Sequence, residues 1–189
     1  IDLVSIDSDY LPRTNYKPNI PLENFKIDGI NYDKEKSTYD NYIDNYKLCF
    51  RKMLSQPRVR TLIGAIYPPK TSHINGVLSI VFNNLNTTLE LAGLASSIVY
   101  DFYIKTIGKS NMYNDTLSNF PLGVKDYFKN KILVRTLMLN CLTTYYTSIW
   151  QKTFSIPFKL DKWSKNDSRL SDFSKLSNDY IKNYFINSG

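Results

Sequence analysis

Hydrophobic and polar positions alternate in residues 46–54 (YKLCFRKML), which predicts a half-buried strand. Its two faces would carry Tyr46, Leu48 and Phe50 on one side and Lys47, Cys49 and Arg51 on the other. A helix that begins near Tyr39 is the competing interpretation. Residues 1–40 are polar and interrupted by prolines, so they are predicted to form an extended entry with at most one short strand.

Two continuous apolar runs follow, and each predicts a buried strand. Residues 60–67 (RTLIGAIY) are apolar on both faces and end at a double proline, which cannot continue a hydrogen-bonded ladder. This run is predicted to be the central strand, and residues 76–82 (GVLSIVF) its neighbour. The polar residues 68–75 (PPKTSHIN) would join the two strands as a loop.

Helical spacing is clearest between residues 87 and 107. Thr87 and Glu90 fit a capping box at the start, and Gly108 fits the position after the end. Apolar residues recur along one stripe and also outside it, which predicts a helix buried over much of its surface. The stripe consists of Leu91, Leu94, Ala95, Ile98, Phe102 and Ile107. A polar loop, residues 109–119, would follow.

After Gly123 the spacing predicts helices only. One long helix is expected over residues 124–150, with inward side chains at Leu133, Leu137, Cys141, Tyr145 and Trp150. A final amphipathic helix is marked by Leu170, Phe173, Leu176, Tyr180, Ile181 and Tyr184. The expected fold class is α+β, a small mixed or antiparallel sheet with a packed helix, followed by a helical C-terminal region. We expect an α+β core with its extended N-terminal segment over residues 1–123 and the helical region over residues 124–189.

The composition predicts a soluble globular protein, because 42% of the 189 residues are hydrophobic and 22% are charged. The most apolar stretch, residues 85–107, is interrupted by Glu90, Asp101 and Lys105, so no membrane segment is expected. The start resembles no signal peptide, which favours a cytoplasmic location. It also lacks an initiating Met, so we expect a piece of a longer protein.

The charge balance adds only a weak indication of function. The formal net charge of +7 is compatible with nucleic acid as a partner. However, Lys greatly outnumbers Arg, and the chain is rich in Asn, Ile, Tyr and Ser, as expected from an AT-rich genome whatever the function.

The sequence predicts no active site and no metal site. Cys49 and Cys141 lie far apart and match no metal spacing, and His73 is the single histidine, so two free buried thiols are expected. The seven glycines form no phosphate-binding motif. The double proline at residues 68–69 lacks the preceding Asn or Asp and the following aromatic residue that amino-group methylation requires. The acidic residues form no nuclease-like set.

Three stretches together carry a family resemblance. They are Phe50-Arg51-Lys52 with residues 59–69 (VRTLIGAIYPP), residues 94–103 (LASSIVYDFY) with 119–122 (NFPL), and residues 133–146 (LVRTLMLNCLTTYY) with Trp150, Trp163 and Arg169-Leu170. Their order and spacing over residues 46–170 resemble the region after the methylase domain in Eco57I-like adenine-specific DNA methyltransferases and type II restriction-modification proteins of bacteria. Gly64 stands where that family usually has Ala, and Phe120-Pro121 where Leu-Pro is usual.

The resemblance implies that the chain is a target-recognition domain. In that family this domain clamps double-stranded DNA against the methylase domain of the same parent protein. The methylase domain flips an adenine and methylates its amino group with S-adenosylmethionine. The family's methylating residues are not in this chain, so the cofactor is expected in the parent protein, and neither a catalytic residue nor a cofactor is expected here.

Recognition of duplex DNA needs phosphate contacts for affinity and base-edge contacts for sequence. We expect the base-reading surface in loops at one edge of the sheet, within residues 70–75 and 109–114. The candidate DNA-binding residues are Arg51, Lys52, Arg58, Arg60, Lys70, Thr71, His73, Asn75, Lys109, Ser110, Asn111 and Asn114. The competing interpretation is solvated loops and ordinary surface charge, with Arg60 as a structural partner of Asp101 or Glu90.

Two other functions stay open at this point. The chain could be a non-catalytic structural or interaction module whose helices after residue 124 dock on another domain of the parent protein. It could also be a small independent enzyme, although no candidate residues for catalysis stand out. The abundant aromatic residues could stack on bases. The helical spacing of Phe173, Tyr180 and Tyr184 predicts packing instead, as do Trp150 and Trp163.

Overall fold

The computed structural model describes residues 6–10, 19–21, 24, 32–33, 38–39, 41–165, 167 and 169–186. Most of the predicted extended entry therefore lies outside the described residues. The prediction of at most one short strand there is wrong, because two short strands pair antiparallel, β1 (Tyr32–Asp33) and β2 (Thr38–Tyr39). A short 3-10 helix, η2 (Tyr42–Asp44), leads into the main sheet.

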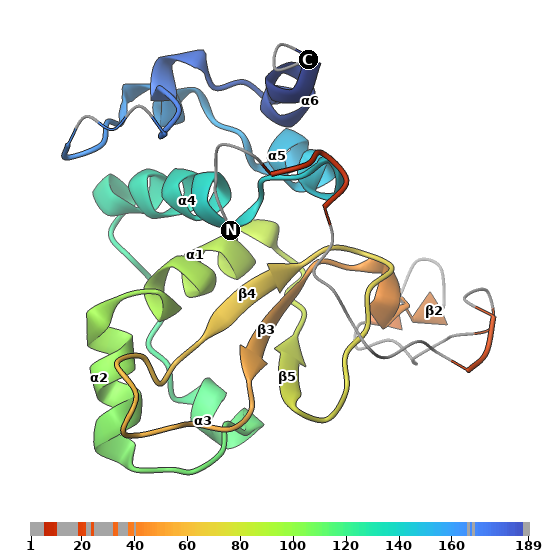
Figure 1. Ribbon diagram of the computed structural model, residues 1–189, viewed down its shortest axis with the longest axis vertical. Helices are drawn as coiled ribbons and strands as arrows, with labels where there is room; N and C mark the ends of the chain where they lie inside the picture. Colours follow the sequence, from red (N-terminus) through yellow and green to blue (C-terminus); the bar gives the residue numbers. More distant parts are fainter. Residues whose placement is uncertain are drawn as a thin grey trace.

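A three-stranded antiparallel sheet forms the centre of the N-terminal half (Figure 1). Its strands are β3 (Lys47–Arg51), β4 (Gly64–Tyr67) and β5 (Val77–Ile80), in the order β4-β3-β5. Together with the packed helices, this sheet confirms the predicted α+β fold. The strand predicted over residues 60–67 was expected at the centre of the sheet, and this is wrong. β3 is central, and β5 pairs with β3 instead of β4.

Residues before β4 leave the sheet because a side chain takes over their hydrogen bonds. The backbone N–H groups of Thr61 and Leu62 both donate to Asp101 Oδ1, at 2.8 and 2.7 Å. A carboxylate that satisfies two buried donors replaces the strand ladder at this point. The strand predicted over residues 60–67 therefore shortens to Gly64–Tyr67.

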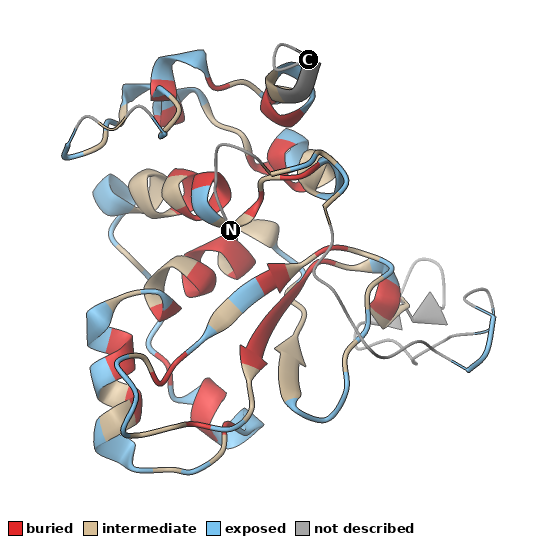
Figure 2. Ribbon diagram, in the orientation of Figure 1, coloured by how far each residue is buried: buried red, intermediate tan, exposed pale blue. Residues whose placement is uncertain are grey.

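The central strand is buried on both faces. Leu48 lies opposite Ile66 and Ile80 and faces the core. The other face is closed as well, since Lys47 is 0% and Cys49 3% exposed (Figure 2). The expectation of a half-buried strand is therefore wrong, because side chains outside the sheet cover this second face as well: Lys47 Nζ lies 5.5 Å from the centre of the Tyr42 ring.

The predicted helix over residues 87–107 is two helices, α1 (Leu85–Ala95) and α2 (Ile98–Ile107). The cap of α1 is Asn84 instead of Thr87, and its side chain accepts from the N–H of Asn86. Ser97 caps α2 and breaks the helix, which rotates the apolar stripe out of phase. Ile98 and Phe102 are consequently 80% and 66% exposed instead of buried. The predicted stop is confirmed, because Gly108 adopts the left-handed conformation with φ 69°.

Helix α1 lies between the sheet and α4 (Asp126–Asn140), so the molecule is layered (Figure 1). Gly93 permits the close approach of the two helices. A Cβ atom at this position would lie 2.5 Å from both Ile132 Cγ2 and Thr136 Oγ1. One continuous core cluster includes side chains from β3, α1, α4 and the segments that follow. The division at residue 123 remains a prediction.

The long helix predicted over residues 124–150 is broken. After α4 come η3 (Thr144–Tyr146) and α5 (Thr147–Thr153). A side chain of α5 stabilises the turn after α4, since the buried Trp150 donates its indole N–H to the Cys141 carbonyl at 2.9 Å. Four of the five predicted inward residues are buried, but Tyr145 is 40% exposed.

The C-terminal segment lies beyond α4 and α5 (Figure 1). It contains η4 (Ile156–Leu160), η5 (Phe173–Lys175) and α6 (Tyr180–Ile186). The final helix therefore starts ten residues later than its predicted marker Leu170, because residues 170–179 form turns and η5. A further short helix, α3 (Asn114–Ser118), falls within the predicted loop after α2. The packing role predicted for Phe173, Tyr180 and Trp150 is confirmed by their burial.

Candidate functional site

Lys52 joins the two loops that the sequence predicts as a recognition surface. Its backbone N–H donates to the Gly76 carbonyl, and its carbonyl accepts from the N–H of Met112, at 2.9 and 2.7 Å. Met53 forms a bridge with Asn111 next to it. The end of β3 is therefore held between the start of β5 and the segment before α3, at the lower end of the sheet in Figure 1.

The side chain of Lys52 makes contacts with both loops. Its Nζ donates to Asn75 Oδ1 at 2.8 Å and lies 5.3 Å from the centre of the Tyr113 ring. A lysine ammonium over an aromatic face is attracted by the electron density of the ring. Lys52 is half-buried, whereas Asn75 and Tyr113 are exposed. We call these three residues the Lys52 cluster.

The loop at residues 109–114, next to α3, is attached to the protein interior. Met112 is 0% exposed, and the N–H of Leu54 donates to the Ser110 carbonyl. Lys109 pairs with Asp115, and the hydrogen bond from Lys109 lowers the pKa of that carboxyl. The carbonyl of Lys109 also accepts from Gln56 at 2.9 Å. The exposed polar side chains of this loop therefore lie on a backbone that hydrogen bonds and the buried Met112 hold in place.

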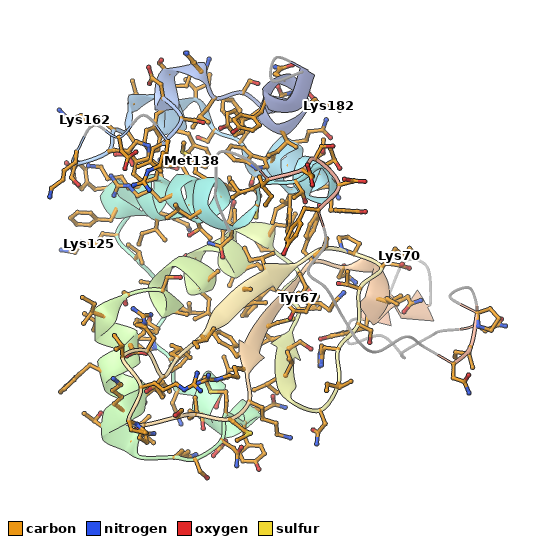
Figure 3. All side chains as sticks on the ribbon, viewed as in Figure 1. Tyr67, Lys70, Lys125, Met138, Lys162 and Lys182 are labelled. Carbon is orange, nitrogen blue, oxygen red and sulfur yellow. The ribbon has the colours of Figure 1, made fainter. Side chains whose placement is uncertain are left out.

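The other predicted loop, residues 70–75, runs along the sheet from the end of β4 to the start of β5, so its two ends lie apart. Lys70 lies near the end of β4, beyond Tyr67 (Figure 3). There it pairs with Asp44, and its φ of 64° is in the left-handed region. Thr71 bonds locally to the Pro68 carbonyl. The structure therefore places Lys70 and Thr71 away from Asn75 and the Lys52 cluster.

His73 lies between these ends, on the side of the sheet away from the core. Its Nε2 contacts Ser79 Oγ, which also bonds the hydroxyl of Tyr42, and its Nδ1 lies 3.0 Å from the Ile74 carbonyl. These bonds tie the middle of the loop to β5 and η2. They use both ring nitrogens of His73 for holding the loop.

The three predicted arginines have different environments. Arg51 turns back to its own segment, since Nε donates to the Met53 carbonyl at 2.9 Å. Arg58 is exposed. Arg60 is a structural partner of Asp101, at 3.5 Å, and also donates to the Ala95 carbonyl. Its alternative partner Glu90 instead accepts from the backbone N–H groups of Gly123 and Val124.

The remaining candidates lie near the Lys52 cluster. Ser110 and Asn111 precede the buried Met112, and Asn114 is the exposed first residue of α3. Tyr113, which is 50% exposed, is not among the sequence candidates. A sequence signal for it exists, namely a large aromatic residue inside a polar loop between two of those candidates.

No three His, Cys, Asp or Glu side chains are placed to hold a metal ion in the part of the chain that the structure describes. Both cysteines are buried and free, as predicted. Burial raises the pKa of the Cys49 thiol to about 12, so it is not a thiolate at neutral pH.

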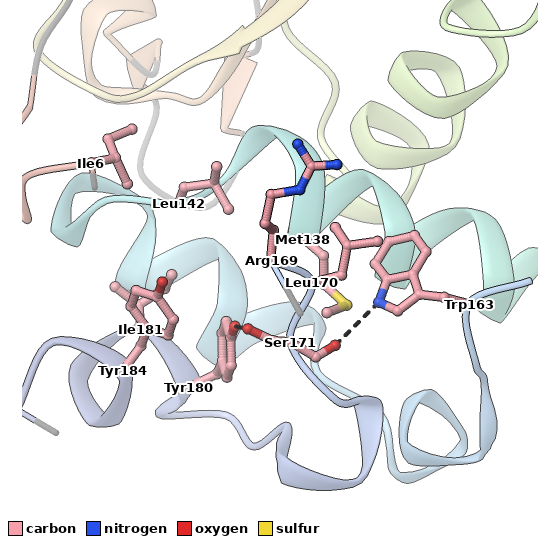
Figure 4. Close-up of a pocket in the computed structure, with 10 residues that line it drawn as sticks. All are labelled: Ile6, Met138, Leu142, Trp163, Arg169, Leu170, Ser171, Tyr180, Ile181 and Tyr184. Carbon is pink, nitrogen blue, oxygen red and sulfur yellow. Dashed lines mark hydrogen bonds between the residues drawn. The ribbon is translucent and has the colours of Figure 1, made fainter. Parts of the chain in front are cut away.

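A small pocket lies between α4, Trp163 and α6 (Figure 4). Its lining is mostly apolar. The polar atoms of Trp163 and Tyr180 are already bonded to Ser171, at 3.1 and 2.7 Å. The Arg169 guanidinium, which also lines the pocket, donates to Asp167.

Compared with the known protein families, with curated proteins and with solved structures, the chain matches none. Within the described ranges, no helix has the length and apolar character needed to cross a bilayer.

Proposed function

We propose that this chain is a double-stranded DNA recognition module. It would be the target-recognition part of a larger bacterial, cytoplasmic adenine-N6 DNA methyltransferase or restriction-modification enzyme. The observation that supports this most is the Lys52 cluster, in which one cation and two exposed side chains from two loops come together. The polar pattern of the sequence selects both loops, and Lys52 lies in one of the stretches that carry the family resemblance.

The cluster suits a phosphate- and base-contacting surface. Loops on a rigid scaffold are common sites of recognition, because the scaffold fixes the side chains without burying them. Here the rigid part consists of β3, the start of β5 and the buried Met112. The net charge of +7 favours approach of a polyanion.

The parent protein would supply the chemistry. Its methylase domain would bind S-adenosylmethionine and contact this chain across the DNA. This chain would contribute binding and sequence selection, and no catalytic step is assigned to it. The parent is proposed as a site-specific adenine methyltransferase, with or without an endonuclease activity.

The first test is fluorescence anisotropy of this chain with a pool of random duplexes over a salt series. We expect affinity that falls linearly with salt on logarithmic axes. Lys52→Met should lower the affinity for duplex DNA, because it removes a cation from the proposed binding surface. The matched control is Lys162→Met, which removes the same charge at the opposite end of the molecule (Figure 3). Absence of binding at low salt would contradict the proposal.

A different surface favours a second function, the interaction module. On the outer side of α2, Ile98, Val99 and Phe102 are 80%, 73% and 66% exposed. Large apolar side chains gathered on one helix are typical of a protein interface. The occupant would be the methylase domain of the parent protein. Phe102→Ser should weaken capture of that purified domain while the affinity for duplex DNA stays unchanged; unchanged capture would count against this second function.

A further inference from the structure

We infer that Lys52 and Asn75 together read a guanine base in the major groove. This inference rests on the proposed function, since it names the base that the Lys52 cluster selects. It differs from the usual expectation for an asparagine, which pairs with adenine. The reason is the direction in which Lys52 holds the Asn75 amide.

The amide orientation follows from chemistry. A lysine ammonium carries only hydrogen-bond donors, so the group that it contacts must be the carbonyl oxygen of Asn75. The 2.8 Å contact between Lys52 Nζ and Asn75 Oδ1 has this arrangement. The amide nitrogen of Asn75 consequently lies on the other branch of the side chain, where its N–H groups have no contact with Lys52.

The pair therefore offers donors to a ligand. Asn75 contributes the N–H groups of its amide, and Lys52 contributes the ammonium hydrogens that are not used on Asn75. The Asn75 oxygen is a poor acceptor for a further donor, because the ammonium beside it repels an approaching N–H group. The Tyr113 ring lies over the ammonium and helps to hold it in place.

A ligand that complements this pair must present two acceptors side by side. Guanine does so in the major groove through its O6 and N7 atoms. Adenine presents N7 beside an amino group, and that amino group would meet a donor. Cytosine presents an amino group as its donor, so it also mismatches. Thymine presents a single acceptor, O4, beside a methyl group, so guanine with its two acceptors fits the pair best.

A phosphate group also presents acceptors, so the experiment must separate the two sources. The first arm selects duplexes from a randomised pool with the wild-type chain and with Asn75→Asp. The substitution keeps the shape of the side chain and its contact with Lys52, but replaces the amide N–H groups by an acceptor. We expect the wild type to enrich guanine at one position, and the variant to lose this preference by about tenfold or to shift it toward cytosine.

The second arm uses only the wild-type chain, so it does not depend on the folding of a variant. The enriched guanine is replaced by 7-deazaguanine, which lacks the N7 acceptor. We expect about a tenfold loss of affinity for the wild type. If Asn75→Asp folds, as its thermal unfolding would show, it should be insensitive to the same replacement.

The outcomes distinguish the two proposals. If Asn75→Asp weakens all duplexes equally and 7-deazaguanine has no effect, the pair contacts phosphate, and the guanine inference is overturned while DNA recognition stands. Enrichment of adenine at the position that depends on Asn75 would also overturn it. If the wild-type chain has no salt-dependent affinity for any duplex, DNA recognition fails and the guanine inference fails with it.

Discussion

Asp101 and Lys52 both use a charged side chain to join separate segments, but in opposite environments. Asp101 is 5% exposed and holds the N–H groups of Thr61 and Leu62, with Arg60 and Lys105 nearby. Lys52 holds Asn75 and Tyr113 at a surface that solvent reaches. The contacts of Asp101 therefore stabilise the interior. The contacts of Lys52 leave hydrogen-bond donors at the surface, where a ligand can reach them.

Glu90 belongs with Asp101 in this comparison. It is 6% exposed and accepts from two successive backbone N–H groups, those of Gly123 and Val124, at 3.0 and 2.9 Å. These donors lie just before α4, so Glu90 fixes where the chain enters that helix. Each buried carboxylate thus replaces backbone partners that a neighbouring strand or helix turn does not supply.

The largest expected effect is on stability, from the substitution Asp101→Ala. It leaves two buried N–H groups and nearby cations without their acceptor, which should lower the free energy of unfolding by about 3 kcal/mol. Urea denaturation measures this change. The control is Asp115→Ala, which removes an exposed ion pair and should have a much smaller effect. Equal losses for both variants would remove the distinction between interior and surface.

Glu90→Ala should have the next largest effect. It leaves the N–H groups of Gly123 and Val124 without their acceptor, so we expect a loss of about 2 kcal/mol in unfolding free energy. Amide hydrogen exchange would locate the change, since protection should fall first at residues 123–124. A uniform loss of protection across the chain would mean that Glu90 does not act locally.

The pH dependence of stability should separate the two kinds of contact further. Burial raises the pKa of Asp101, but the hydrogen bonds from Leu62 and Thr61 and the cations Arg60 and Lys105 outweigh it. The net pKa lies below the ordinary value of 3.8. A carboxyl with a lowered folded-state pKa stabilises the fold above its unfolded pKa and loses this contribution as the pH falls through the folded value.

The measurement compares wild type with Asp101→Ala in urea from pH 6 down into the acid range. The difference between their unfolding free energies should be constant at the upper end and shrink as the pH falls below about 4. A difference that grows with acidification would show that the carboxylate is not the stabilising form.

The smallest expected effect on stability belongs to Lys52→Met. Because the contacts of Lys52 are partly exposed, its loss should change the unfolding free energy by no more than about 0.5 kcal/mol. The DNA affinity should nevertheless fall, as proposed above. A large destabilisation by Lys52→Met would mean that this residue acts as a structural bridge, like Asp101, and would break the comparison.

For the candidate site, the sequence indicated the parts but not their assembly. Asn75 and Asn111 follow from the predicted polar loops, and Lys52 from the basic residues near the end of the first predicted strand. Their meeting depends on the end of β3 lying between residues distant in sequence. The same packing separates Lys70 from Asn75, and it turns Arg60 inward to Asp101. Residues 70–75, which the sequence predicts as one exposed loop, therefore belong to two separate surfaces in the structure.

By itself, the sequence determined the features that depend on neighbouring residues. The apolar segments around β3 and β5, the strand end at the double proline and the helix stop at Gly108 are local steric or hydrophobic preferences. Tertiary structure decided the strand order, the shortening of the second predicted strand and the break after Asn140. These depend on partners far along the chain, such as Asp101 for the segment before β4, and periodicity carries no information about which distant group satisfies a buried N–H.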